Sequence, residues 1–207
     1  MLSVLFKDID WENITTVGFD MDGTLYDEFD FIKQVYSEID KQLIQNKNVL
    51  SFMKQRWMEK GSSYPYIFAE AYDKCKRKSF EKEVFISKAL DIYRKFDPKI
   101  SLTEGNKKLM AYFKKKFKLY LITDGNYELQ KKKFVSLNLS EYFEEKYVVF
   151  TGKYPPEFHK PNTKSLELID LNTDKSVFFG DREIDKEFAI SSQIQFIKVV
   201  NMLEIRS

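Results

Sequence analysis

Short runs of apolar, β-branched and aromatic residues recur along the chain and predict five β-strands. These runs cover residues 16–20, 118–123, 147–150, 176–180 and 196–200. Helical patterns separate the last four runs, so strands and helices alternate along this part of the chain. Alternation of this kind is typical of an α/β fold with a doubly wound parallel sheet and helices on both faces.

Four segments carry the helical patterns of this α/β region: residues 101–117, 126–139, 162–171 and 183–193. Ser101 and Glu104 stand at capping-box spacing at the start of the first segment. Asn162 is the predicted N-cap of the third segment. Helices at these places would return the chain from one parallel strand to the next.

The segment between the first two predicted strands follows a different pattern. Residues 28–97 contain no strand-like run and predict four amphipathic helices, at 29–46, 48–60, 66–78 and 80–96. A crossover between parallel strands needs only about a dozen residues. We therefore expect residues 28–97 to form an inserted helical subdomain, and residues 1–27 and 98–207 to form the α/β core.

The composition narrows the class of protein. Hydrophobic residues make up 43% of the 207-residue chain, which is enough for a sizeable core. The chain has 34 basic and 32 acidic residues, and this balance of +2 does not indicate a nucleic-acid or membrane-surface binder. Lysine groups at 114–116 and 131–133 lie on predicted helices, and we expect them to form solvated faces.

Cys75 is the single cysteine, so no internal disulfide can form. No apolar run approaches the length that spans a membrane. Both observations favour a soluble protein of a reducing compartment, and we expect it in the cytoplasm.

Polar residues that can take part in chemistry follow four of the predicted strands. The first strand runs into "DMDGT" at 20–24, and the second ends at Thr123. The third leads through a loop to Lys160, and the fourth is followed by Asp181 and Asp185. Because doubly wound sheets bind ligands outside the carboxyl ends of their strands, we expect these residues to converge on one small volume.

Asp20 and Asp22 pose the main question, because two like charges at the end of a buried strand repel each other and lose hydration. A cation that prefers oxygen ligands, such as Mg²⁺, would offset this repulsion. A phosphoryl group would find donors in Thr123, Lys160 and backbone N–H groups. One carboxylate could then attack phosphorus while the other handles the proton.

Four motifs make the chain resemble the haloacid dehalogenase (HAD) superfamily. They are "FDMDGTLYD" (19–27), "LITDG" (121–125), "HKP" (159–161) and "GDREID" (180–185), and the resemblance covers nearly the whole chain. It is closest to the phosphatases of that superfamily, which carry a helical cap inserted after the first motif. The resemblance implies a Rossmann-like sheet, a helical cap at 28–97 and a Mg²⁺-dependent phosphatase that works through an aspartyl-phosphate intermediate.

The resemblance also implies a role for each residue of the reaction. Asp20 would be the nucleophile. Asp22 would be the general acid for the leaving oxygen and then the general base for the attacking water. Thr123 would bind a phosphoryl oxygen with the N–H of Asp124 beside it, and Lys160 would neutralise charge between the phosphoryl group and the nucleophile.

The metal ligands follow from the same resemblance. The carboxylates of Asp20 and Asp181 and the backbone carbonyl of Asp22 would hold Mg²⁺. Asp185 would support the metal, either directly or through water. His159, the only histidine, lies beside the third motif, but Asp22 already fills the acid/base role, so we interpret it as a loop residue.

The substrate expected from this reading is a small phosphorylated metabolite, such as phosphoglycolate, a sugar phosphate or a nucleotide. Two alternatives stay open. A phosphomutase of the β-phosphoglucomutase type would use the same nucleophile and acid but return the phosphoryl group to a sugar. A non-catalytic binding protein with this fold would be expected to lack at least one of Asp20, Asp22, Lys160 and Asp181, and all four are present. A dehalogenase has no use for Asp22, since its leaving halide needs no proton.

Overall fold

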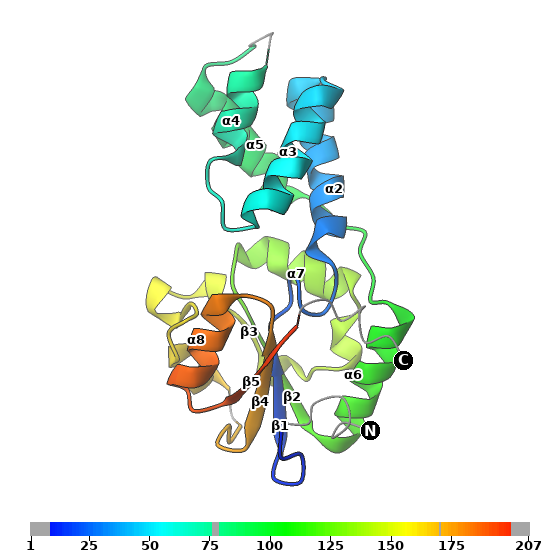
Figure 1. The fold of residues 1–207 in the computed structure, drawn as a ribbon, viewed down its shortest axis with the longest axis vertical. Coiled ribbons are helices and arrows are strands. Elements are labelled where there is room, and N and C mark those ends of the chain that lie inside the picture. The colour runs from blue at the N-terminus through cyan, green and yellow to red at the C-terminus, as the bar shows by residue number, and fades with distance from the viewer. Residues whose placement is uncertain (1–8, 76–78, 170, 200–207) are drawn as a thin grey trace. The chain divides into compact units, whose positions relative to one another are not determined.

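The computed structural model describes residues 9–75, 79–169 and 171–199. Its centre is a five-stranded parallel sheet in the order β3-β2-β1-β4-β5 (Figure 1). The strands are β1 (Thr16–Phe19), β2 (Lys118–Thr123), β3 (Val148–Phe150), β4 (Ser176–Gly180) and β5 (Gln195–Lys198). The predicted α/β fold is therefore confirmed. Strands β2 and β4 have the predicted bounds, β1 ends and β3 begins one residue inside the predicted runs, and β5 begins and ends earlier than predicted; residue 200 lies outside the described residues.

Strand β1 lies at the centre of the sheet, with β2 on one side and β4 on the other. Phe19 is in register with Leu121 of β2 and with Phe179 of β4. The chain winds from β1 outward to β3 and then crosses to the other side of β1, so the strand order reverses between β1 and β4. This is the switch point at which doubly wound folds bind their ligands, and it lies at the carboxyl ends of β1 and β4.

Aromatic side chains bury both faces of the sheet. On one face Phe19 stacks on Phe179 at 5.0 Å between ring centroids, and Phe113 of α6 (Glu104–Lys116) meets Phe179 at 5.5 Å. On the other face Phe178 packs against Phe188 of α8 (Glu183–Ser191) at 5.1 Å. Figure 1 shows α6 and α8 on opposite sides of the sheet. Because each buried phenylalanine contributes about 1.5–3 kcal/mol, these contacts hold the strand ends in fixed positions.

The helices of the α/β unit differ from the predictions in two places. The N-cap of α6 is Thr103 rather than Ser101, because the Thr103 hydroxyl accepts a hydrogen bond from the backbone N–H of Asn106 at 3.1 Å. The predicted helix at 162–171 is only a 3₁₀ turn, Lys164–Leu168, and Asn162 does not cap it. Its apolar positions 166, 168, 169 and 171 all pack against the core, a spacing too dense for one α-helical stripe.

The remaining connections are also short. Helix α7 covers Tyr127–Ser136. Further 3₁₀ turns lie at Leu139–Glu141, Glu145–Tyr147, Thr151–Lys153 and Pro156–Phe158.

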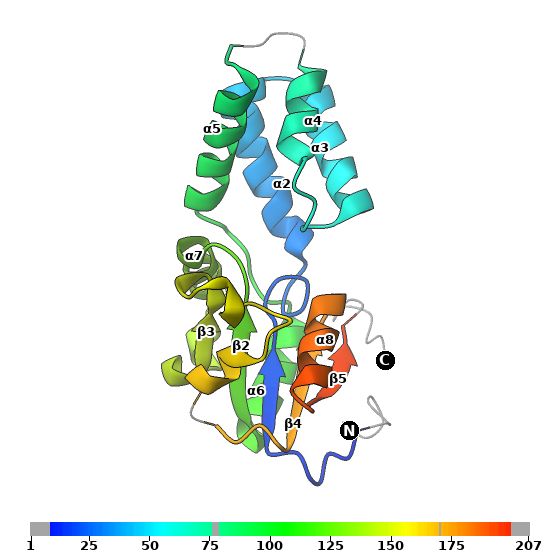
Figure 2. The same cartoon turned by 90° about the vertical axis from the view of Figure 1, so that its left-hand side faces the viewer.

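The chain divides into two compact units, Met1–Glu28 with Lys99–Ser207, and Phe29–Pro98. The second unit contains a π-helical turn at Asp40–Ile44 and the helices α2 (Glu28–Ile39), α3 (Lys47–Lys60), α4 (Ile67–Lys74) and α5 (Lys82–Lys95). The first residue of α2, Glu28, belongs to the first unit. Figure 2 shows these helices running alongside one another. Among its described residues this unit has no strand. The predicted helix at 29–46 is α-helical to Ile39, continues as the π-helical turn to Ile44 and ends at Gln45, which has a left-handed conformation with φ of 52°; Asn46 then caps α3.

Aromatic contacts also form the interior of the helical unit. Phe68 of α4 meets Tyr36 of α2 and Tyr93 of α5 at 6.1 and 6.3 Å between ring centroids. Arg56 of α3 pairs with Glu70 of α4 at 2.6 Å. In the described residues, no helix combines the length and apolarity needed to cross a membrane.

Gly18 allows the closest approach within the sheet. A Cβ atom at this position would lie 2.2 Å from Cζ of Tyr120, the neighbouring residue on β2. The Tyr120 ring is fully buried and its hydroxyl lies 3.0 Å from Oγ of Ser176, so the ring is held over Gly18.

We expect Gly18→Ala to lower the free energy of unfolding by about 1–3 kcal/mol, because the added methyl overpacks the sheet. Gly105→Ala is the matched control, since its nearest neighbour would be Oγ1 of Thr103 at 3.8 Å and alanine favours a helix by up to about 1 kcal/mol. Denaturant unfolding of both variants measures the difference. Equal stability of Gly18→Ala and the wild-type protein would contradict the close packing of Tyr120 on β1.

Candidate active site

Three carboxylates meet at the switch point of the sheet. Asp20 follows β1, Asp181 follows β4, and Asp185 lies in the first turn of α8. One carboxylate oxygen from each lies within 4.8 Å of the others. Gly23 makes this possible: its φ is +73°, and a Cβ atom there would lie 2.4 Å from Oδ2 of Asp181.

Lys160 reaches into this cluster from the loop that follows β3. Its Nζ lies 2.7 Å from Oδ1 of Asp20 and 2.5 Å from Oδ1 of Asp185. All three side chains are buried. The Lys160 ammonium and the guanidinium of Arg182, which also interacts with the three carboxylates, supply two positive charges against three negative ones, so the cluster as a whole attracts a further cation.

The free oxygens of the cluster suit a divalent metal ion. Oδ2 of Asp20 is buried and has no hydrogen-bond partner in the part of the chain that the structure describes. Asp185 is already engaged at both oxygens, because Oδ2 accepts a hydrogen bond from the backbone N–H of Arg182 at 3.0 Å. Carboxylate oxygens are the ligands that Mg²⁺ prefers. The residues present therefore fit such an ion, with Asp20 and Asp181 as the more available side chains.

Burial governs the protonation of the cluster. It raises the pKa of Asp20 to about 7, against the attraction of Lys160 and with the repulsion of Asp185. Burial also raises the pKa of Asp181 to about 6. A bound cation would oppose both shifts, because it favours the ionised carboxylates.

Asp22 lies in a separate network of hydrogen-bond donors. Its Oδ1 accepts from the hydroxyl of Tyr26 and from Nζ of Lys133 at 2.8 Å, and its Oδ2 accepts from Nε2 of Gln130 at 2.9 Å. Burial alone would raise the pKa of Asp22, but the charge of Lys133 and these hydrogen bonds hold it below its ordinary value. These donors therefore favour the ionised form of Asp22, which lies beside the cluster of Asp20.

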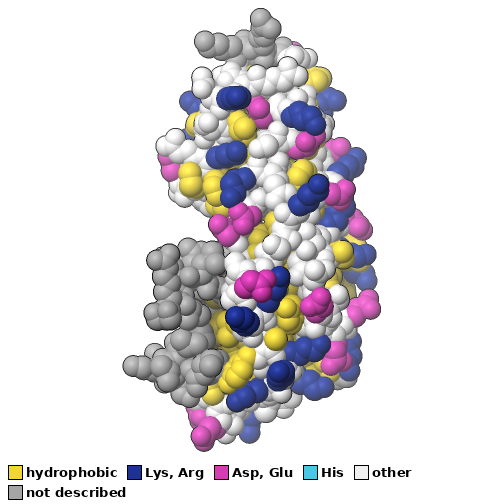
Figure 3. All heavy atoms as spheres, turned by 90° about the vertical axis from the view of Figure 1, so that its right-hand side faces the viewer, with side chains coloured by type: hydrophobic (Ala, Val, Ile, Leu, Met, Phe, Trp, Pro, Cys, Tyr) yellow, Lys and Arg dark blue, Asp and Glu magenta, His cyan; other side chains and the backbone are white. Residues whose placement is uncertain are grey.

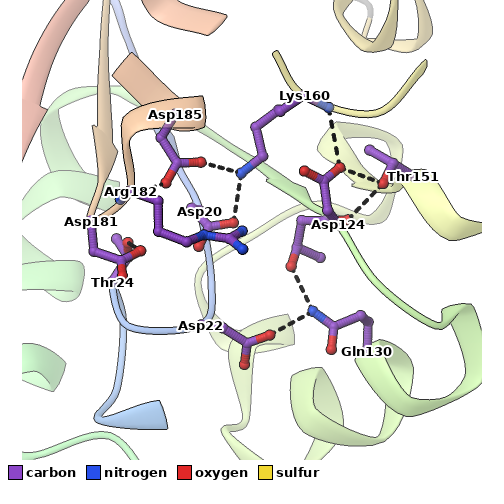
Figure 4. Close-up of polar contacts among 11 residues, drawn as sticks. Asp20, Asp22, Thr24, Asp124, Gln130, Thr151, Lys160, Asp181, Arg182 and Asp185 are labelled. Atoms are coloured by element: carbon purple, nitrogen blue, oxygen red, sulfur yellow. Dashed lines mark hydrogen bonds and ion pairs between the residues drawn. The ribbon is translucent and has the colours of Figure 1, made fainter. Parts of the chain in front are cut away.

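Thr123 and Asp124 end β2 and begin the next loop. Oγ1 of Thr123 accepts a hydrogen bond from Nε2 of Gln130 at 2.7 Å. Oδ1 of Asp124 accepts from the hydroxyl of Thr151 at 2.6 Å and from the backbone N–H of Lys160 at 3.3 Å (Figure 4). The Asp124 side chain therefore ties together the loops after β2 and β3.

All predicted site residues lie at the carboxyl edge of the sheet, in three connected groups. Asp20, Lys160, Asp181 and Asp185 form one group, Asp22 and Thr123 are joined through Gln130 in a second, and Asp124 lies in a third. Figure 4 shows the three groups in one view.

Sequence reasoning missed the contributions of α7. The group 131–133 was expected to be solvated, and this is wrong for Lys133, which is only 2% exposed and pairs with Asp22. Lys133 lies four residues after the buried Leu129 and three after Gln130, so placing the buried face of the helix would have found it. Asn126 fixes this phase, because its Oδ1 caps α7 by accepting from the N–H of Leu129.

Two further charged residues beside the cluster were also missed. Although burial disfavours the charged form of Arg182, the carboxylates of Asp20, Asp185 and Asp181 raise the pKa of its guanidinium. Burial and the charge of Asp22 raise the pKa of Glu28 to about 8. Arg182 therefore adds positive charge to the site, whereas the raised pKa of Glu28 favours its neutral form near pH 7.

His159 lies outside these groups. Its Nε2 is 3.3 Å from the backbone carbonyl oxygen of Tyr154 in the same loop. The histidine therefore has a local backbone partner.

A hollow of about 420 Å³ lies at the opposite end of the sheet. Thr15, which precedes β1, and Lys118, which begins β2, contribute to its wall with lysines 114, 115 and 116. Figure 3 shows basic side chains gathered around the lower part of the face that α6 forms. Lysines in the last turn of a helix are stabilised by its carbonyl end. The hollow is thus remote from the carboxylates. The position of lysines 114, 115 and 116 at the carbonyl end of α6 is enough to explain the basic charge around it.

Comparison with known proteins identifies the family to which the chain belongs. A family model described as haloacid dehalogenase-like hydrolase matches residues 17–199, which include every residue of the three groups. A search of the curated proteins found no match.

Solved structures share this fold at low sequence identity. A candidate β-phosphoglucomutase from Thermotoga maritima is 21% identical, with a TM-score of 0.66 over 91% of this chain and 86% of that chain. A candidate HAD-hydrolase from Bacillus subtilis, solved with bound magnesium, is 15% identical, with a TM-score of 0.65 over 94% and 89%. A candidate phosphoglycolate phosphatase from Lactobacillus plantarum is 16% identical, with a TM-score of 0.58 over 93% and 89%. At these identities the likeness shows the fold alone.

Proposed function

The chain belongs to the haloacid dehalogenase-like hydrolases, and we propose that it is a Mg²⁺-dependent phosphatase acting on a small phosphorylated metabolite. One observation carries this proposal. The buried carboxylate of Asp20 is held at Oδ1 by Lys160, while its Oδ2 has no partner among the described residues. A carboxylate oxygen that is oriented but not hydrogen-bonded is suited to attack phosphorus once a bound cation keeps Asp20 ionised against its raised pKa.

In the first half-reaction Asp20 attacks the phosphorus atom and the bond from phosphorus to the substrate alcohol breaks. Asp22 enters this step protonated, with the proton retained from the preceding cycle, and gives that proton to the leaving oxygen. The products are the free alcohol and an aspartyl-phosphate at Asp20. The Thr123 hydroxyl and the N–H of Asp124 would hold phosphoryl oxygens, and Lys160 would compensate the charge that builds up beside Asp20.

In the second half-reaction Asp22 takes a proton from water and the water oxygen attacks phosphorus. The bond from phosphorus to Asp20 breaks, inorganic phosphate leaves, and Asp22 carries the proton for the next cycle. The lowered pKa of Asp22 suits the base role, because the donors around it stabilise the carboxylate that remains after Asp22 has given up its proton.

The proposed metal ligands are the carboxylate of Asp20, through the oxygen that does not attack phosphorus, the carboxylate of Asp181 and the backbone carbonyl of Asp22. Asp185, whose two oxygens accept from Lys160 and from the Arg182 N–H, would support the ion through water. When bound, Mg²⁺ supplies positive charge beside the phosphoryl oxygens and offsets the carboxylates.

We assign substrate choice to residues 28–97 as a helical cap, because the residues of the α/β unit described above offer groups for the phosphoryl end of a substrate and for a metal ion. A cap that closes would exclude water during the first half-reaction and contact the rest of the substrate. The single cysteine fits an enzyme of the reducing cytoplasm. The net charge of +2, which is small for a nucleic-acid-binding protein, fits a substrate that is a small metabolite.

A screen of phosphorylated metabolites with Mg²⁺ tests the proposal, with released phosphate as the readout. The panel includes phosphoglycolate, sugar phosphates and nucleoside monophosphates. We expect at least one compound to release phosphate at a rate that is proportional to the enzyme concentration. Conversion of one sugar phosphate into its isomer without phosphate release would identify a phosphomutase instead. Tight binding with neither reaction would identify a binding protein.

A further inference from the structure

Two polar side chains of α7 are buried against the proposed reaction site. Apolar side chains could fill the same helix face without the free-energy cost of removing polar groups from water. Gln130 and Lys133 are each 2% exposed. Burying an ammonium group is expensive unless a charge partner is present. The partner here is Asp22, at 2.8 Å from Nζ of Lys133. The two residues are thus placed for Asp22 rather than for the helix itself.

Gln130 makes two hydrogen bonds from a single nitrogen. Its Nε2 donates to Oδ2 of Asp22 at 2.9 Å and to Oγ1 of Thr123 at 2.7 Å (Figure 4). An amide nitrogen carries two hydrogens, so both are used. Thr123 accepts in this arrangement, which leaves the proton of its own hydroxyl to donate elsewhere.

The hydrogen-bond donors around Asp22 are distributed unequally between its two carboxylate oxygens. Oδ1 accepts from both Tyr26 and Lys133, whereas among the described residues Oδ2 accepts from Gln130 alone. A carboxylate oxygen accepts about two hydrogen bonds. Oδ2 is therefore the oxygen with room for a transferred proton, and Gln130 fixes its direction.

We infer that Gln130 is a positioning residue that couples the proton-transfer carboxylate of Asp22 to the phosphoryl-binding hydroxyl of Thr123, with Lys133 as the anchor of Asp22. The inference rests on the proposed phosphatase function. Gln130 directs the Thr123 proton toward a phosphoryl oxygen and holds Oδ2 of Asp22 for the leaving alcohol. Lys133 donates to Asp22, whereas Gln130 donates to both Asp22 and Thr123. The two residues therefore differ in what their loss should change.

The test uses two substrates whose leaving groups differ in their need for a proton. p-Nitrophenyl phosphate releases a stable phenolate, whereas glycerol phosphate releases an alkoxide that requires a general acid. The variants are Gln130→Leu, which removes both donors, Gln130→Glu, which keeps the shape of the side chain, and Lys133→Met. Lys131→Met is the matched control, because Lys131 is exposed on the same helix. The measurement is kcat/KM for both substrates, together with inhibition by inorganic phosphate.

We expect the ratio of glycerol phosphate to p-nitrophenyl phosphate activity to fall by about 10-fold or more in the Gln130 and Lys133 variants. Inhibition by inorganic phosphate should weaken in both Gln130 variants, because leucine makes no hydrogen bond to Thr123 and glutamate would accept the Thr123 proton instead of leaving it for a phosphoryl oxygen; it should stay near wild type in Lys133→Met. Lys131→Met should leave both readouts unchanged. Gln130→Glu keeps the test valid if Gln130→Leu does not fold.

A purely structural role would reduce both substrates by the same factor, since it changes only the amount of folded enzyme. An unchanged substrate ratio in folded Gln130→Glu and Lys133→Met would therefore overturn the inference while leaving the phosphatase proposal standing. If the wild-type enzyme released phosphate from neither substrate nor from any compound of the screen, the proposed function would fail and this inference with it.

Discussion

Asp20→Asn should abolish turnover, with a loss of at least about 1,000-fold in kcat, while the fold stays intact. An amide oxygen attacks phosphorus poorly and is a weak ligand for Mg²⁺. The fold should survive because Lys160 keeps its ion pair with Asp185 at 2.5 Å. Phosphate release at saturating substrate measures the loss, and thermal unfolding checks the fold.

The matched control is Asp174→Asn, the same change at an exposed position before β4. It should keep full activity. More than a few per cent of wild-type activity in folded Asp20→Asn would exclude the covalent role of Asp20.

Removal of divalent metal should also abolish activity, and added Mg²⁺ should restore it. Asp20, Asp181 and Asp185 place more negative charge at the switch point than Lys160 and Arg182 together balance, so the phosphoryl group would meet net repulsion without a further cation. Calcium should inhibit, because its longer and more variable coordination displaces the nucleophile. The measurement is the rate of phosphate release after chelation and during titration with each ion.

Asp181→Asn separates the metal from other effects of the chelator. This variant should need a higher Mg²⁺ concentration for half-maximal activity, since it replaces a charged ligand by a neutral one. Full activity in excess chelator would remove the metal from the mechanism.

The residues at the strand ends could be predicted because two simple patterns agree on them. Short apolar strands identify the parallel sheet, and polar residues directly after a strand must lie at its carboxyl edge. Asp20 and Asp181 follow neighbouring strands on the two sides of the switch point, so topology alone brings them together. Thr123 ends β2 and Lys160 lies in the loop after β3. Both strands lie on the side of β1 opposite to β4, so the two residues approach Asp20 from that side.

The partners of Asp22 could not be predicted by the same reasoning. Lys133 and Gln130 lie within a helix, and their direction depends on where that helix begins and which face it buries. A lysine in a run of three lysines indicates a solvated face unless the helical phase is known. Local signals also compete: Ser101 has capping-box spacing, yet Thr103 caps α6, because more than one residue before a helix can supply the oxygen.

The most direct test of the central claim is to trap the phosphoryl group on Asp20. Asp22→Asn should form the intermediate from p-nitrophenyl phosphate, whose leaving group needs no acid, but should hydrolyse it slowly because the general base is lost. After an acid quench, peptide mass spectrometry should find one phosphoryl group on the peptide that contains Asp20, and none when Asp20→Asn is added to the variant. Release of nitrophenol with no phosphorylated peptide, or a phosphoryl group on any other residue, would contradict the account.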